Sequence, residues 1–142
     1  YNYYESKSDL LGDTIESIWR EIFFNHEDEQ AFKDVAACIS WIYKRLEYGN
    51  EQFPGFFSLH SLGFMKDEKM DGKKKMLQTW GHILNGLCDI LKNDPKIRPD
   101  VFDEQFTEKQ FADILFSLIL VSMIRQDYNP SSILMLINKT LY

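Results

Sequence analysis

Cysteine and histidine are scarce in this chain of 142 residues, and their positions exclude most metal and disulfide chemistry. The two cysteines, Cys38 and Cys88, lie far apart and form no Cys-x-x-Cys pair, so neither a disulfide ladder nor a thiolate zinc site is indicated. None of the three histidines follows a glutamate by three positions, so the Glu-x-x-His motif of di-iron bundles is absent. We therefore expect free thiols, a reducing cytoplasmic location, and no metal or other cofactor.

Long apolar runs, glycine-rich loops and alternating strand patterns are also missing. The longest apolar run, residues 114–124, is shorter than the ~20 residues that cross a bilayer, and we expect no signal peptide. No glycine pattern of the P-loop or dinucleotide-binding type occurs. No segment alternates apolar and polar residues with period two, so the sequence predicts no sheet. The short apolar runs predict no membrane span.

Positive charge is in deficit, since 16 Lys and Arg face 22 Asp and Glu, for a net charge of −6. The surplus lies in residues 1–70, which hold thirteen acidic and seven basic residues, whereas residues 71–142 hold nine of each. Binding to a phosphate backbone needs clustered Lys and Arg, so nucleic acid is not expected as a partner. A negative surface suits a basic protein partner instead.

Apolar residues recur with the period of a helix in five segments. These segments are residues 8–24, 28–47, 72–92, 110–125 and a last one that begins at Pro130. Gly49 is the expected stop after the second segment, and Asn129 is the expected cap of the last. The sequence thus predicts an all-α, single-domain bundle over residues 1–142, with about five main helices and short connecting helical turns at 56–63 and 98–105.

The segment 110–125 stands out because apolar residues occupy nearly every side of it. Thr107 with Gln110 three positions later forms a capping box at its start. With Ile114, Leu118 and Val121, the segment has more apolar residues than one buried stripe requires. A helix that is apolar all round is buried all round, so we expect this to be the central helix, packed on every side.

Residues 51–65, EQFPGFFSLHSLGFM, combine core-grade hydrophobicity with a proline and two glycines. Two interpretations stay open. Phe56, Leu59 and Phe64 can plug the open end of the bundle, as loops between long helices usually do. Alternatively, residues 53–65 can form a sticky patch for a partner, because exposed Phe and Met suit protein interfaces.

Two short motifs carry a resemblance to known families. REIFFNH, from Arg20 to His26, resembles the Arg-x(4–6)-His motif of HEPN-type ribonucleases, and this implies metal-free RNA cleavage by Arg20 and His26. TWGHI, residues 79–83, resembles the Asn-Trp-Gly-Arg signature of Bcl-2-type helical bundles, and this implies a groove for an amphipathic helix of a partner. In this chain Thr79 replaces the Asn and His82 replaces the Arg of that signature.

The sequence shows no activated nucleophile, no pair of carboxylates at a catalytic spacing and no metal-binding motif. We therefore expect a non-enzymatic protein that binds and blocks a basic partner protein. Bacterial immunity proteins, which neutralise cationic nuclease toxins, are often small and acidic in this way. Two acidic clusters are the predicted partner-binding surface. The first is Glu27, Asp28, Glu29 and Asp34, and the second is Asp100, Phe102, Asp103, Glu104, Phe106 and Glu108. In the second, aromatic anchors lie among charges, as at interface hot spots.

Overall fold

The computed structural model describes residues 17, 18, 20–23, 33–56 and 71–142, without the side chains of residues 71–79. Within these ranges all regular elements are helices, so the predicted all-α class is confirmed. The long helices are α2 (Val35–Gln52), α4 (Asp71–Asn93), α5 (Glu108–Arg125) and α6 (Ser131–Leu141). Residues 17, 18 and 20–23 are helical and fall within the first predicted helix, and the rest of that helix lies outside the described residues.

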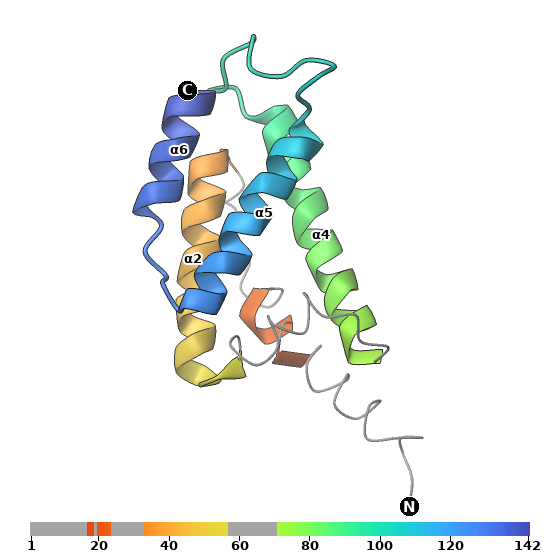
Figure 1. Cartoon of the computed structure of the whole chain (residues 1–142), viewed down its shortest axis with the longest axis vertical. Coiled ribbons are helices and arrows are strands. Elements are labelled where there is room, and N and C mark those ends of the chain that lie inside the picture. Colours follow the sequence, from red (N-terminus) through yellow and green to blue (C-terminus); the bar gives the residue numbers. More distant parts are fainter. Residues whose placement is uncertain (1–16, 19, 24–32, 57–70) are drawn as a thin grey trace, which may run out of the picture.

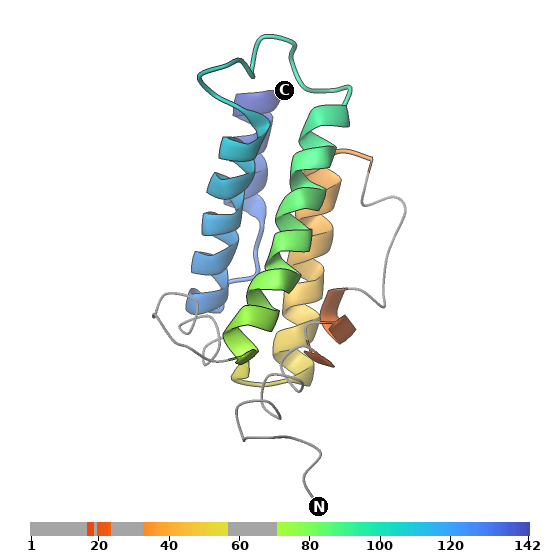
Figure 2. The same ribbon diagram turned by 90° about the vertical axis from the view of Figure 1, so that its right-hand side faces the viewer.

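These four helices lie side by side around a common interior (Figures 1 and 2), and apolar side chains fill it. α4 packs against α5, and α2 packs against both α4 and α6. Each helix buries one apolar stripe in this interior, for which Ile39, Leu46, Leu87, Leu115, Ile119 and Ile137 are examples. The bundle therefore has a single core to which every long helix contributes.

Aromatic rings fix residues 20–23 to the bundle. The ring of Phe23 meets the buried Trp80 edge-on at 5.8 Å, and the rings of Trp80 and Phe116 lie 4.9 Å apart. From α2, Arg45 Nε donates a hydrogen bond to the carbonyl of Ile22 at 2.6 Å. Trp80 of the TWGHI motif is thus a core residue that joins three parts of the chain.

The second helix differs from its prediction at both ends. It begins at Val35 rather than at residue 28, because Asp34 is its N-cap and accepts a hydrogen bond from the backbone N–H of Ala37 at 2.7 Å. Gly49 does not stop it, since Gly49 is buried inside the helix and its carbonyl accepts from the N–H of Phe53. The core contacts of Phe53 outweigh the cost of about 1 kcal/mol that glycine adds in a helix.

Helix α5 keeps its predicted start but not its predicted surroundings. The capping box of Thr107 and Gln110 is present, with both reciprocal hydrogen bonds formed. The prediction that every side of the helix is packed is wrong, because Ile114 and Val121 are each 44% exposed. Apolar composition alone does not say how many neighbours a helix has, and α5 packs mainly on α4.

The structure bears on two further predictions, the start of the last helix and, at Phe56 alone, the role of residues 51–65. The last helix begins at Ser131, with Pro130 in the cap position, one residue later than predicted, although Asn129 Oδ1 still accepts from the N–H of Ser131 at 3.0 Å. Phe56 is buried in the core, as the plug interpretation of residues 51–65 requires. Residues 57–65 lie outside the described part of the chain.

Candidate protein-binding surface

A tight turn joins α5 to α6 and sets the geometry of the surface between them. Gln126 adopts a left-handed conformation with φ of 56°, and its N–H donates to the carbonyl of Met123 at 3.2 Å. The N–H of Asp127 donates to the carbonyl of Ser122 at 3.0 Å, which completes a Schellman motif. The chain therefore reverses within a few residues, and Figure 1 shows α5 and α6 diverging from this turn.

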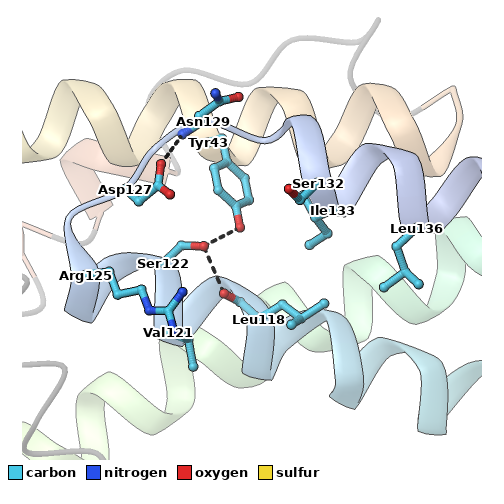
Figure 3. Close-up of a pocket in the computed structure, with 10 residues that line it drawn as sticks. All are labelled: Tyr43, Leu118, Val121, Ser122, Arg125, Asp127, Asn129, Ser132, Ile133 and Leu136. Atoms are coloured by element: carbon cyan, nitrogen blue, oxygen red, sulfur yellow. Dashed lines mark hydrogen bonds between the residues drawn. The ribbon is translucent and has the colours of Figure 1, made fainter.

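A pocket of about 320 Å³ lies where the two helices begin to separate (Figure 3). Its apolar walls are Leu118 and Val121 from α5 and Ile133 and Leu136 from α6. Tyr43 reaches it from α2, which lies behind both helices. The pocket is at the lower end of the size range of small-ligand sites and matches one or two large side chains.

Two hydroxyl groups form the polar floor of the pocket. Tyr43 Oη lies 2.7 Å from Ser122 Oγ, and Ser122 Oγ donates to the carbonyl of Leu118 at 3.0 Å (Figure 3). Because the single hydroxyl proton of Ser122 is used by Leu118, Tyr43 is the donor of the bond between them. Burial raises the pKa of Tyr43 above its usual value, so this pair is a neutral hydrogen bond and not an activated nucleophile.

Opposite charges stand at the mouth of the pocket. Arg125 ends α5, and Asp127 follows the turn; both side chains are exposed. Asp127 Oδ1 accepts from the backbone N–H of Asn129 at 3.1 Å, so the carboxylate is held on the α6 side of the mouth. A ligand entering here passes one charge of each sign at the mouth and meets apolar walls inside the pocket.

Exposed apolar side chains continue from the pocket along α5. At about 100° per residue, Ile114, Leu118, Val121 and Arg125 fall within a sector of about 60° on one side of the helix. Where side chains are described, all the exposed large apolar residues belong to α5 and α6, namely Ile114, Val121, Met135 and Leu136. We call the pocket together with Ile114, Leu118, Val121 and Leu136 the α5/α6 groove.

An acidic loop crosses the end of the bundle at which α5 and α6 are farthest apart. At one end, the backbone N–H and the guanidinium of Arg98 donate to the carbonyls of Leu141 and Thr140 in α6, both at 2.8 Å. At the other end, Thr107 caps α5. This loop, drawn in teal in Figure 1, holds much of the second predicted acidic cluster between the two helices.

Half of that second cluster serves the fold of the loop. Phe102 and Phe106 are half-buried and pack with the buried Phe111, at ring distances of 6.0 and 5.9 Å. Asp103 Oδ1 accepts from the backbone N–H groups of Gln105 and Phe106, both at 2.8 Å. These three side chains hold the loop in shape, so less of their surface is available to a partner than the sequence predicted.

The remaining members of the second cluster present charge to solvent. Asp100 and Glu104 are exposed, and Glu108 is half-exposed in the first turn of α5, where it complements the helix dipole. Asp113 is exposed one turn further along α5. Residues 100–113 hold five carboxylates and one lysine, and we refer to this stretch as the acidic end.

The first predicted cluster is described only at Asp34. Its carboxylate caps α2 and also pairs with Lys96 Nζ at 2.7 Å. The hydrogen bond from Lys96, aided by the N–H of Ala37, lowers the pKa of Asp34 below its usual value despite partial burial. Asp34 therefore ties α2 to the end of α4. Glu27, Asp28 and Glu29 lie outside the described residues.

Asp94 is a further carboxylate with several contacts, and all of them are structural. It is buried, and its oxygens accept from the backbone N–H of Val35 at 3.1 Å, that of Lys96 at 2.9 Å, and the hydroxyl of Tyr142 at 2.7 Å. Burial, followed by the bond to Asp94, raises the pKa of Tyr142. The cluster therefore joins α2, α4 and α6 at one end of the bundle.

Residues singled out by family resemblance are only partly described. Arg20 is exposed, and His26 lies outside the described residues, so the predicted ribonuclease pair stays a prediction. His82 is exposed on α4, and the side chain of Thr79 is not described. The α5/α6 groove is on other helices than the TWGHI motif.

The groove residues were missed as a site by sequence reasoning. Tyr43, Val121 and Leu136 occupy ordinary positions in apolar stripes, and a stripe does not reveal which of its members a neighbouring helix leaves uncovered. The one available signal was the excess of apolar residues around α5, which we interpreted as burial. The structure shows that part of this excess faces solvent instead.

Comparisons of the chain with protein-family models, curated proteins and solved structures gave no match. Across the described ranges, no group of three or more His, Cys, Asp or Glu side chains is placed to hold a metal ion. None of the helices in those ranges combines the length and apolar character needed to cross a membrane. Among the described residues, the α5/α6 groove holds uncovered apolar side chains, and the acidic end beside it gathers carboxylates.

Proposed function

We propose that this chain is a non-enzymatic domain that binds a basic protein partner through the α5/α6 groove and the adjoining acidic end. The observation that carries the proposal is their adjacency: uncovered Ile114 and Val121 lie on the helix that begins at the five carboxylates of residues 100–113. Apolar contact area supplies affinity, and the acidic end speeds encounter with a cationic surface and disfavours acidic competitors.

A binding role also agrees with the chemistry of the groove. The Tyr43 and Ser122 hydroxyls satisfy each other and the carbonyl of Leu118, so neither is coupled to a base. The charged groups at the mouth, Arg125 and Asp127, suit recognition by ion pairs at an interface rim. Neutralisation of a cationic nuclease toxin, as by an immunity protein, is the most specific form of the proposal, and a HEPN-like ribonuclease is the enzymatic alternative.

The partner can be identified by photo-cross-linking in a native lysate. We would place a benzophenone amino acid at Val121 in the groove and, as a control, at Lys44, which is exposed on α2. We expect capture of a basic protein at position 121 only, weakening as salt rises from about 0.05 to about 0.5 M because exposed charges are screened. Equal capture at both positions, or an acidic protein bound regardless of salt, would argue against the proposal.

Charge reversal then tests the acidic end with the captured protein. Asp100→Lys with Glu104→Lys should slow association by about tenfold or more, since steering acts on the encounter. Asp103 is left unchanged because its carboxylate holds the loop. The matched control reverses Glu47 and Glu51, two exposed glutamates of α2. If the captured protein is a nuclease, the wild-type chain should also inhibit its cleavage of nucleic acid.

A further inference from the structure

The seam between α5 and α6 is the open seam of the described bundle. α5 packs on α4, α4 on α2, and α2 on α6, whereas α5 and α6 separate beyond their connecting turn. The side chains that would fill this seam remain uncovered: Ile114 and Val121 are 44% exposed and Leu136 is 39% exposed.

From this arrangement we infer that the α5/α6 groove receives one amphipathic α-helix of the partner, with a large apolar side chain in the pocket and basic residues toward the acidic end. The inference rests on the proposed function and names the form of its partner. The stripe from Ile114 to Arg125 is about 17 Å long, so a partner helix of about three turns covers it.

A helix fits this groove better than an extended peptide does. The walls consist of the side chains of Leu118, Val121 and Leu136. The backbone N–H and C=O groups of α5 and α6 are paired within each helix and are not available to a peptide. An extended peptide that binds by strand addition needs backbone partners at a sheet edge, and the described residues contain no sheet. A helix satisfies its own backbone and presents side chains at the three- and four-residue spacing of the stripe.

The ends of the groove give the partner helix its charge pattern. Beyond Ile114 the α5 helix leads to the acidic end, whose carboxylates at Asp100, Glu104 and Asp113 are exposed. Beyond Val121, Arg125 and Asp127 both line the mouth of the pocket and carry opposite charges, so this end of the groove has no net charge. Lys and Arg on the partner helix should therefore gather at its end near residues 100–113, and the other end should be close to neutral.

A peptide selection tests this inference without knowledge of the natural partner. A display library of single helices, randomised along one face, would be panned against the full chain. We expect enriched peptides to carry apolar residues at i, i+4 and i+7 with Lys or Arg clustered at one end. Peptides without this helical period, or with acidic residues at both ends, would overturn the inference.

Two neighbouring residues provide matched variants for the selected peptides. Leu136 lines the pocket, whereas Met135, which is 54% exposed, projects about 180° from the buried face of α6. Leu136→Glu should weaken binding by tenfold or more, because a carboxylate must lose water to lie against an apolar helix. Met135→Glu should leave binding unchanged. Both variants should keep the wild-type Tm, which shows that the fold is retained.

The outcomes separate this inference from the proposed function. One outcome is that no peptide binds the wild-type chain more tightly than the Leu136→Glu variant, while a basic protein is still captured at position 121. This result would rule out a partner helix in the groove and leave the proposed binding function standing. If neither a peptide nor a protein binds, both fail. A concentration-dependent dimer that forms in sedimentation and is lost in Leu136→Glu would assign the groove to a second copy of the chain, and would equally overturn the inference.

Discussion

Tyr43 and Ser122 join α2 to α5 through a hydrogen bond of 2.7 Å between their hydroxyl oxygens. The bond lies at the bottom of the seam that α6 leaves open, so it marks the depth to which a side chain of a partner can penetrate. It also fixes α5 relative to α2 where direct packing between α5 and α6 is sparse. The groove is thus rigid at its floor and uncovered at its rim.

The floor bond predicts different effects for two serines of α5. Ser122→Ala leaves the buried hydroxyl of Tyr43 without its acceptor and should lower the free energy of unfolding by about 1–3 kcal/mol. Ser117, an exposed serine that also donates to the carbonyl four residues earlier, makes no such contact. Ser117→Ala should therefore change stability by about 0.5 kcal/mol or less.

Urea unfolding monitored by circular dichroism measures both serine variants. Tyr43→Phe combined with Ser122→Ala should recover part of the loss, because no unpaired hydroxyl then remains. Equal stability of the Ser122→Ala and Ser117→Ala proteins would show that the bond between Tyr43 and Ser122 contributes nothing to the fold.

The aromatic cluster under the acidic loop predicts a graded series. Phe111 is 3% exposed, and Phe111→Ala should cost about 3–5 kcal/mol of stability. Phe102 is half-buried against it, so Phe102→Ala should cost about 1–2 kcal/mol. Chemical denaturation orders the two. A Phe102→Ala protein as stable as the wild type would mean that this ring is free to serve an interface.

Stability should depend on the ionisation of Asp34 at acid pH. The hydrogen bond from Lys96 holds the folded-state pKa of Asp34 below its ordinary value of 3.8. A carboxyl with a lowered folded pKa adds stability that is complete above the unfolded pKa and is lost as pH falls through the folded pKa. The Tm of the wild type should therefore decline below pH ~4 for this reason.

Asp34→Asn isolates this contribution, because asparagine retains the N-cap but cannot form the ion pair. Its Tm should be lower than that of the wild type at neutral pH and should change less as pH falls to about 2. Asp100→Asn, at an exposed loop position, should follow the wild-type profile. Parallel profiles for the wild type and Asp34→Asn would contradict the assigned role of Lys96.

The sequence predicted the helical class, the span of α5 and the capping box because these depend on local rules. Thr107 and Gln110 are three residues apart, and their reciprocal bonds need nothing beyond that spacing. The end of α2 could not be predicted in this way. Gly49 is a local stop signal, but it was overridden by the packing of Phe53 and Phe56 against residues distant in the chain.

The site was harder to predict than the fold because it depends on what is left uncovered. Val121 and Ile119 are both apolar residues of α5, yet one is 44% exposed and the other is fully buried. They lie on nearly opposite sides of the helix, and the sequence does not reveal which side stays uncovered. The side of Val121 is uncovered because α5 and α6 diverge, and no local pattern encodes that divergence. Conversely, Asp34 and Asp103 looked like surface charge in the sequence, but each holds backbone N–H groups in place.

The central claim is that the α5/α6 groove is the surface on which a partner binds, and methyl chemical-shift mapping tests it most directly. The captured protein, or the best selected peptide, would be titrated into a chain labelled at Ile, Leu and Val methyl groups. We expect the largest shifts at Ile114, Leu118, Val121 and Leu136, with small changes at core methyls such as those of Leu46 and Leu87. Saturable binding that leaves the four groove residues unshifted and perturbs another face would contradict it.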